Sequence, residues 1–366
     1  MSPFPLIDVA GGPEERGERY GRLAADRIAL ALDLYREEFA RKGIGWAEAH
    51  ALADRFLERI ADYDPELTRE MAAIAAGAGQ TLSAVVLINA RTELMFWKLR
   101  APSPSGAGEE CTSAIVLPEA SRDGRLLHAQ NWDWQPQCAE TTVVLRIRGA
   151  DGVPSILTCA EAGQLARHGL NAAGIAITAN GLHSDQDYGR FGIPNPLIRR
   201  RMLASTSLAR AMFVLNNAPR AFSHHLGISH ADGEAFGIEA TPDDLFVLEP
   251  RDGLLVHANH FVSPVAQLKV RDLNIARTPE TLYRQGRVEK SLRAARDGVD
   301  MDALKAALAD RWGSPDAVCR SPAERPGGMV SATVYTLVMD AGAGRLWLAP
   351  RPYEDGAEFT EYRLED

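Results

Sequence analysis

The segment Cys111–Trp134, CTSAIVLPEASRDGRLLHAQNWDW, is where the pattern of this sequence changes from helical to β. Two runs rich in β-branched and apolar residues, Thr112–Leu117 and Leu126–Gln130, flank a linker that contains the turn-forming step Asp123-Gly124. The segment therefore predicts a β-hairpin whose first strand begins directly after a cysteine.

The length of this hairpin limits what can lie opposite Cys111. In an antiparallel pair the numbers of opposed residues have a constant sum, so pairing Leu117 with Arg125 places Cys111 opposite Asn131. A register two residues longer places it opposite Asp133. We expect Cys111 to meet a polar side chain of the second strand, with Asp133 as the acidic candidate.

The chain before this segment is mainly helical in pattern. From Pro13 to Trp97 apolar residues recur at three- and four-residue steps, which predicts several helices with one buried face each. Helix starts and stops are expected at Asp64-Pro65 and at Gly77-Ala78-Gly79. The stretch Ala101–Glu110, APSPSGAGEE, has no apolar face and is expected to be an exposed connection that ends at Cys111.

The chain after the hairpin mixes short β-rich runs with helical ones. The runs are numerous enough for two sheets, and the segregation of strands from helices indicates a layered α+β fold. Strands are expected at 142–147, 156–159, 175–180, 236–240, 245–248, 254–258, 333–339 and 346–348, and helices at 196–204, 208–216, 281–295 and 301–311.

Composition narrows the class of protein. The net charge of −9 argues against nucleic-acid or anionic-membrane partners, which attract basic surfaces. The chain starts without a basic and apolar leader, and its four cysteines form no C-x-x-C pair. We expect a cytoplasmic protein without disulfides or structural zinc.

Several motifs together resemble one enzyme family. Glu110-Cys111-Thr112-Ser113-Ala114 and Ala129-Gln130-Asn131-Trp132-Asp133-Trp134 are similar to the nucleophile region of the C45 peptidase family, the N-terminal-nucleophile (Ntn) hydrolases that resemble acyl-coenzyme A:6-aminopenicillanic-acid acyltransferase. The segments Gly169–Ala176 and His257–Phe261 match in order and spacing.

The resemblance implies a fold and an activation step. The fold is the four-layer αββα sandwich, here with a helical N-terminal segment. The implied activation is cleavage between Glu110 and Cys111, which makes residues 1–110 a small subunit and residues 111–366 a large subunit that together form one Ntn domain. A free α-amine has a pKa near about 7.7–8.0, so Cys111 would then carry its own base.

The resemblance also assigns roles to residues. Cys111 is the implied nucleophile, Asp133 the aspartate that orients the α-ammonium group, and Asn259 the donor to the oxyanion. Asn180 is a candidate second donor. Arg320, Arg325 and Ser331 compete for the position of an arginine that the family often carries before its penultimate strand.

The implied chemistry is acyl transfer from a small amide or thioester through an acyl-Cys111 intermediate. Hydrolysis is the preferred outcome, because the sequence has no motif for an acceptor. No cofactor is expected, although acyl-coenzyme A is a conceivable co-substrate. The segment Leu182–Asn195, which includes His183 and Tyr188, is either a pocket loop or an ordinary exposed loop.

Two other interpretations stay open. One is a metal-dependent hydrolase that uses the region of His257 and His260, although no H-E-x-x-H helix is present and no metal is expected. The other is a catalytically silent protein of the same fold that binds a small molecule.

Overall fold

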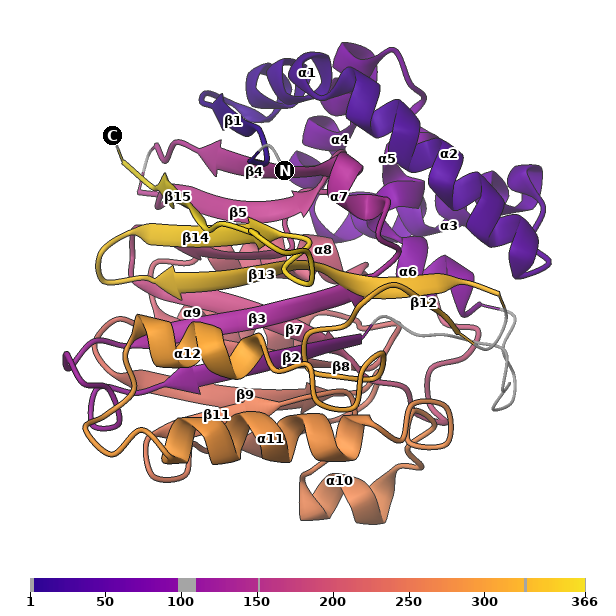
Figure 1. Ribbon diagram of the computed structural model, residues 1–366. Helices are drawn as coiled ribbons and strands as arrows, with labels where there is room; N and C mark the ends of the chain where they lie inside the picture. The colour runs from indigo at the N-terminus through magenta and orange to yellow at the C-terminus, as the bar shows by residue number, and fades with distance from the viewer. Residues whose placement is uncertain (1–2, 98–109, 151, 326–327, 366) are drawn as a thin grey trace.

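The computed structural model describes residues 3–97, 110–150, 152–325 and 328–365. Its first part is a group of helices at the top of Figure 1. These helices are α1 (Pro13–Leu23), α2 (Ala25–Arg41), α3 (Trp46–Tyr63), α4 (Pro65–Ala78), α5 (Leu82–Asn89) and α6 (Arg91–Met95). The helical prediction is confirmed, but Ala24 and Ala90 each divide a run that the sequence pattern left continuous.

Local chemistry explains the ends of α4. The side chain of Asp64 accepts hydrogen bonds from the backbone N–H groups of Glu66 and Leu67, which have no partner within the helix. Gly79 ends the helix with φ 65°, a left-handed conformation that glycine adopts at low cost. Both signals were visible in the sequence, and both predicted boundaries are confirmed.

The strands of the described residues form two stacked sheets. The eight-stranded sheet has the order β1 (Leu6–Val9), β4 (Thr142–Ile147), β5 (Ile156–Glu161), β6 (His168–Asn171), β7 (Ile175–Gly181), β8 (His224–His230), β9 (Glu234–Ala240) and β10 (Leu245–Leu248). The seven-stranded sheet has the order β11 (Leu254–His257), β2 (Glu110–Val116), β3 (Leu127–Trp134), β13 (Val330–Asp340), β14 (Arg345–Pro350) and β15 (Thr360–Arg363), with β12 (Ala323–Glu324) paired to β13.

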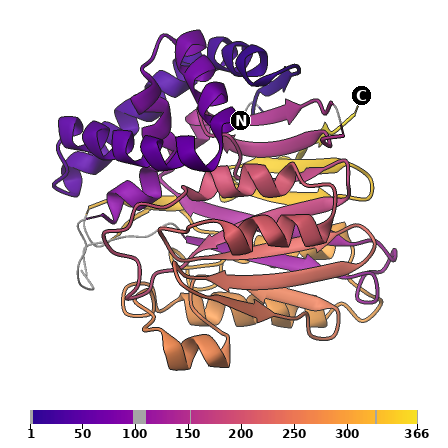
Figure 2. The same cartoon turned by 180° about the vertical axis from the view of Figure 1, so that it is seen from behind.

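Helices cover the outer face of each sheet. In Figure 1, α11 (Thr281–Arg293) and α12 (Met301–Leu308) lie in front of the seven-stranded sheet, and α10 (Pro264–Lys269) lies below them. The reverse view in Figure 2 shows α8 (Asn195–Leu203) and α9 (Leu208–Asn217) over the eight-stranded sheet. The order helix, sheet, sheet, helix confirms the predicted αββα sandwich, and the short α7 (Cys138–Thr141) joins β3 to β4.

The hairpin formed by β2 and β3 has a register between the two that the spacing suggested. Glu110 is opposite Asp133 and Cys111 is opposite Trp132, so the expectation that Cys111 faces Asn131 or Asp133 is wrong. The loop between β2 and β3 is one residue shorter than the longer of the two predicted registers requires. Glu110 is also the first residue of β2 and is buried, which corrects its assignment to an exposed linker; the rest of Ala101–Glu110 lies outside the described residues.

Some strands gave too little signal in the sequence. β1 lies within the helical first part and pairs parallel to β4, so the eight-stranded sheet is not wholly antiparallel. β8 contains three histidines and a glycine, and β6 is only four residues long. The composition of β6 and β8 has low β-propensity, so these two strands depend on pairing with their neighbours in the sheet.

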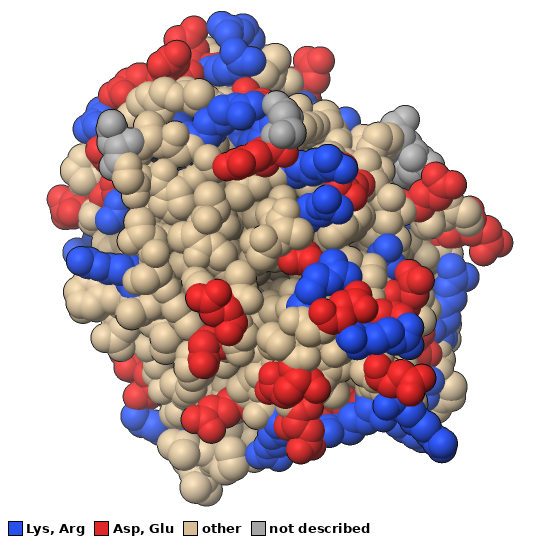
Figure 3. All heavy atoms as spheres, turned by 90° about the vertical axis from the view of Figure 1, so that its left-hand side faces the viewer, with Lys and Arg blue, Asp and Glu red and all other residues tan. Residues whose placement is uncertain are grey.

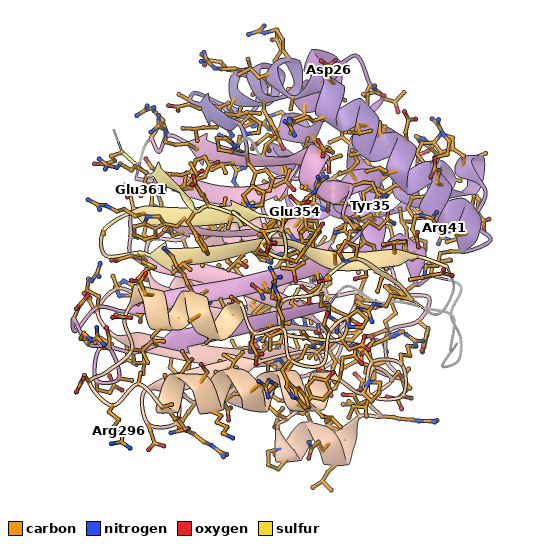
Figure 4. The ribbon with its side chains drawn as sticks, in the orientation of Figure 1. Asp26, Tyr35, Arg41, Arg296, Glu354 and Glu361 are labelled. Atoms are coloured by element: carbon orange, nitrogen blue, oxygen red, sulfur yellow. The ribbon has the colours of Figure 1, made fainter. Side chains whose placement is uncertain are left out.

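A buried polar network joins the first 110 residues to the remainder. Arg91 of α6 pairs with Glu161 of β5 at 2.7 Å, and Tyr35 of α2 donates to the other oxygen of Glu161 at 2.5 Å. Figure 4 shows Tyr35 among the side chains between the helices and the sheets. Asn89 donates to the carbonyl of Gly163 at 2.8 Å. These contacts are noncovalent, so they do not require an unbroken backbone between the two parts of the chain.

The surface carries charges of both signs. Lysine, arginine, aspartate and glutamate side chains are interspersed on the face shown in Figure 3, without a basic patch on that face. No single helix in the described ranges is long and apolar enough to cross a membrane, and α4 with α5 passes such a test only as a pair bent by 115°.

Candidate active site

Cys111 is the second residue of β2, and its side chain is fully buried. Side chains alternate along a strand, so Cys111 shares a face with Ser113 and, on β3, with Gln130 and Trp132. Ser113 donates to Asn180 Oδ1 at 2.9 Å and Gln130 donates to the carbonyl of Ala179 at 2.6 Å, both on β7. The thiol therefore points between the two sheets.

Asp133 lies on the opposite face of the hairpin, next to the backbone that precedes Cys111. It is paired with Glu110, and directly opposed residues in an antiparallel sheet lie about 4.5–5.5 Å apart at Cα. If the chain began at Cys111, Asp133 would be the acidic neighbour of its α-nitrogen. The register thus places Asp133 beside the peptide bond that contains the Cys111 nitrogen, and the charge of Asp133 also acts on the Cys111 thiol.

Asn259 holds that nitrogen directly. It follows β11, the strand that pairs with β2, and its Oδ1 accepts the backbone N–H of Cys111 at 2.8 Å. Its Nδ2 donates to the carbonyl of Gly181 at 2.9 Å. The amide presents its oxygen to Cys111, because its NH₂ group is directed at a carbonyl.

Arg284 of α11 reinforces this arrangement. Its guanidinium donates to Asn259 Oδ1 at 2.9 Å, to the carbonyl of Cys111 at 2.8 Å and to Thr112 Oγ1 at 2.8 Å. Since guanidinium groups only donate, the contact with Arg284 fixes the oxygen of Asn259 on the side of Cys111. Arg284 thereby locks both the start of β2 and the rotamer of Asn259.

Arg320 is the centre of a second buried cluster. It pairs with Glu280 at 2.7 Å, with Asp133 at 3.3 Å and with Glu110. Thr333 of β13 donates to Asp133 at 2.7 Å and accepts the backbone N–H of Arg320 at 2.8 Å. Arg320 thus connects the two residues that flank the proposed cleavage position, Glu110 in sequence and Asp133 across the hairpin.

Burial dominates the electrostatics of the site. It raises the pKa of both Glu110 and Asp133, although Arg320 and Arg284 partly offset this effect. Burial and the charge of Asp133 raise the pKa of the Cys111 thiol to about 12. In the uncleaved chain the thiol is therefore almost wholly protonated at neutral pH.

The other sequence candidates occupy different positions. Asn180 uses its oxygen for Ser113 and its NH₂ for the carbonyl of His257 at 3.0 Å, and so links β7 to β11. Arg325 pairs with Asp316 instead of with the site. Ser331 is buried in β13, opposite Ala323 of β12. Of the three competing residues, Arg320 is the one that pairs with Asp133.

The histidines proposed for a metal site are engaged in other contacts. His257 bonds to Glu239 at 2.9 Å and stacks on His225 with ring centroids 3.7 Å apart. His260 lies beyond the end of β11 and bonds to Thr281 at 3.0 Å, so the two are not on opposite faces of one strand as expected. Within the described residues no three histidine, cysteine, aspartate or glutamate side chains are grouped to hold a metal.

Three residues of the site were missed in the sequence. Glu280 and Arg284 begin the helical run of α11, and Thr333 lies inside a buried strand. Charged residues near a helix start and a threonine in a strand are ordinary features, so no local signal distinguished them. Only their position around Glu110 and Asp133 identifies them.

Known proteins match this chain along most of its length. The family model of acyl-coenzyme A:6-aminopenicillanic acid acyl-transferase matches residues 120–350. The 40 kDa form of acyl-coenzyme A:6-aminopenicillanic-acid-acyltransferase from Emericella nidulans is 29% identical over 350 residues, which cover 91% of this chain and 89% of that protein.

Solved structures extend the comparison to the fold. A mutant of conjugated bile acid hydrolase from Clostridium perfringens superimposes with a TM-score of 0.50 at 14% identity, over 69% of this chain and 92% of that one. Penicillin V acylase from Agrobacterium tumefaciens gives a TM-score of 0.47 at 14% identity, over 69% and 86% of the two chains.

These findings confirm the family expected from the motifs around Cys111 and the Ntn-hydrolase fold. They also confirm the expectation of an enzyme, of the acyltransferase class. The chain belongs to the acyl-coenzyme A:6-aminopenicillanic acid acyl-transferase family.

Proposed function

We propose that the chain cuts itself between Glu110 and Cys111, and that Cys111 then hydrolyses a small amide through an acyl-cysteine. The observation that carries this proposal is the 2.8 Å hydrogen bond from the Cys111 N–H to Asn259 Oδ1, with Asp133 across the hairpin from Glu110. Cys111 lies beyond the last residue of β2 that pairs with β11, so a side chain, and not a strand carbonyl, accepts its backbone N–H.

The cleavage proceeds by an N-to-S acyl shift. The Cys111 sulfur attacks the carbonyl carbon of Glu110, the C–N bond breaks, and the nitrogen takes up a proton to become an α-amine. Water then hydrolyses the thioester, which leaves a carboxyl group on Glu110 and restores the thiol. Arg284, bonded to the Cys111 carbonyl, and Asn259 hold the scissile bond while the sulfur attacks.

The same groups serve the mature enzyme. The free α-amine accepts the thiol proton as the sulfur attacks a substrate carbonyl, and it returns this proton to the leaving amine. Asp133 and Asn259 Oδ1 are acceptors suited to the resulting α-ammonium group. The role of Asn259 as donor to the oxyanion stays a prediction, since it requires its Nδ2 to leave the carbonyl of Gly181.

Water resolves the acyl-cysteine in this proposal, and the product is a carboxylic acid. A thioester such as acyl-coenzyme A is the alternative acyl donor, and an amine acceptor would convert hydrolysis into transfer. The two pieces, 1–110 and 111–366, would stay together through the Arg91–Glu161 network and the β1–β4 pair.

Intact mass of the purified protein tests the processing step. Two fragments that meet at Glu110/Cys111 in the wild type, and one unbroken chain in Cys111→Ala, are the expected results. An unbroken wild-type chain that still turns over amide substrates refutes it. Trapping an acyl adduct on Cys111 from a panel of N-acyl amines and acyl thioesters identifies the intermediate.

The two rival functions have their own tests. A metal-dependent hydrolase loses activity on chelation, whereas the cysteine mechanism is indifferent to it. A silent binding protein would show no preferential labelling of Cys111 over Cys138, Cys159 and Cys319 by a thiol-directed electrophile.

A further inference from the structure

A small, partly open cavity lies near the Cys111 site. It has a volume of about 10 Å³, which admits one water-sized group, and its apolar walls include Phe96, Phe222 and Leu182. Phe96 and Phe222 stack with ring centroids 5.1 Å apart. Phe96 follows α6 in the first 110 residues, so the cavity is built from both pieces of the chain.

Two lining residues connect the cavity to the catalytic groups. The carbonyl of Gly181, which lines it, is the acceptor of Asn259 Nδ2. Asn274, also in the lining, donates to the carbonyl of Asn259 at 3.1 Å. A group bound in this cavity would therefore contact residues that are hydrogen-bonded to Asn259, whose side chain accepts the Cys111 N–H.

His183 presents a hydrogen-bond donor in the same wall. Its Nδ1 is 2.5 Å from a guanidinium nitrogen of Arg277, and a guanidinium only donates, so Nδ1 is the acceptor. Burial and the charges of Arg277 and Lys42 lower the pKa of His183 to about 3, so the ring is neutral. The proton of the neutral ring is then on Nε2, which is buried and has no hydrogen-bond partner in the described residues.

Two cations contact residues that line the cavity: Lys42 lies near Phe96, and Arg277 bonds to His183. Lys42, directly after α2, lies with Nζ 5.7 Å from the centre of the Phe96 ring. Arg277 leaves Nε and Nη2 buried without partners in the described part of the chain, and Tyr188 leaves its hydroxyl in the same condition. Charged and polar donors buried in this way are costly unless an acceptor joins them.

The neighbouring carboxylates are already occupied. Asp187 accepts from both the backbone and the hydroxyl of Ser223, at 2.9 Å and 2.5 Å, and from the backbone of Ser184 at 2.7 Å. Its Oδ2 is 4.0 Å from His183 Nε2, beyond hydrogen-bond range. Glu38 is 3.8 Å from Lys42 and closer, at 2.7 Å, to Arg41.

We propose that Arg277, His183 and Lys42 select substrates that carry a carboxylate, with one carboxylate oxygen in the cavity and the adjoining hydrocarbon against Phe96 and Phe222. A carboxylate only accepts hydrogen bonds and is negative, which matches a site of unpaired donors flanked by cations. This inference rests on the proposed function of Cys111. It assigns a role to the segment Leu182–Asn195 that the sequence left undecided.

The test compares acids with their methyl esters in two arms. One arm uses N-acyl amino acids, whose carboxylate is on the amine side of the scissile bond, and the other uses monoamides of dicarboxylic acids, whose carboxylate is on the acyl side. In the productive arm we expect kcat/KM to favour the acid about tenfold to a hundredfold, mainly through KM. Arg277→Met should bring the ratio close to one, whereas Arg271→Met, which removes a nearby exposed charge, should preserve it.

Stability separates recognition from a structural role. Arg277→Met removes unpaired buried donors but also the hydrogen bond to His183, so the unfolding midpoint should stay about unchanged; a clearly lowered midpoint indicates a structural residue and overturns the proposal. Equal turnover of acid and ester in both arms, no turnover of either acid, or a ratio that survives Arg277→Met also overturns it. Mass of the processed chain and labelling of Cys111 are scored in parallel, so a failure of the proposed catalytic role is recognised separately.

Discussion

Replacing Arg320 by methionine should destabilise the protein through three buried carboxyl groups. Arg320 is fully buried and pairs with Glu110, Asp133 and Glu280. In Arg320→Met, Arg284 remains as the cation that acts on all three. Removing one partner of a buried ion pair typically costs about 3–5 kcal/mol, so we expect a loss of that size in the free energy of unfolding.

The loss should depend on pH in a defined direction. The pKa values of Glu110 and Asp133 are already raised by burial, and without Arg320 they rise further. When the pKa of a carboxyl group is higher in the folded state than in the unfolded state, the free energy of unfolding falls as the pH rises from the unfolded-state pKa through the folded-state pKa. The deficit of Arg320→Met should therefore be larger at about pH 8 than at about pH 5.

Urea unfolding, followed by tryptophan fluorescence, measures this effect in a Cys111→Ala background, where the chain stays in one piece. Arg293→Met is the matched control, because Arg293 pairs with Asp252, which is 81% exposed, and should cost about 1 kcal/mol or less. An Arg320→Met deficit no larger than that of the control, or one equal at both pH values, would refute the buried-cluster argument.

Three further outcomes follow from the site. The rate of self-cleavage of freshly translated chain should increase about tenfold per pH unit between about pH 6 and 9, because the thiolate fraction of Cys111, with a pKa of about 12, rises in that proportion. Gel electrophoresis measures this rate, and a rate that does not change with pH contradicts the prediction. Asn259→Leu should slow the same cleavage about 10- to 100-fold, since it removes an acceptor of a buried N–H, while unchanged kinetics exclude the contact. Arg91→Met leaves Glu161 without its partner at 2.7 Å, and we expect the cleaved pieces to associate about 100-fold or more weakly. Size-exclusion chromatography at low protein concentration measures this association, and Arg36→Met, at an exposed arginine, is the control.

The hairpin that contains Cys111 was recognisable in the sequence, because its signals lie within a short stretch of the chain. The β-branched run after Cys111, the Asp123-Gly124 turn and the order of motifs through His257–Phe261 indicated the family and the αββα fold, which the comparisons confirm. Helix boundaries at Asp64 and Gly79 were readable for the same reason, since capping depends on one or two residues.

Features that depend on contacts between segments far apart in the chain could not be predicted from the sequence. The register of β2 against β3 differs by one residue from either expectation, and that difference exchanges the faces of all side chains. The orientation of Asn259, with its oxygen on the Cys111 nitrogen, is set by Arg284 from a helix 25 residues further on. The choice of Arg320 over Arg325 is made by burial among three carboxylates.

The sequence by itself indicated Cys111 as the candidate nucleophile and determined the family and the order of layers, because hydrophobic pattern, turn residues and motif spacing act over short distances. Only the tertiary structure decided which groups surround the Cys111 nitrogen and which donors line the neighbouring cavity. Those positions are fixed by packing of strands and helices that lie far apart in the chain, and Glu280, Arg284, Arg277 and Thr333 have no local pattern that marks them.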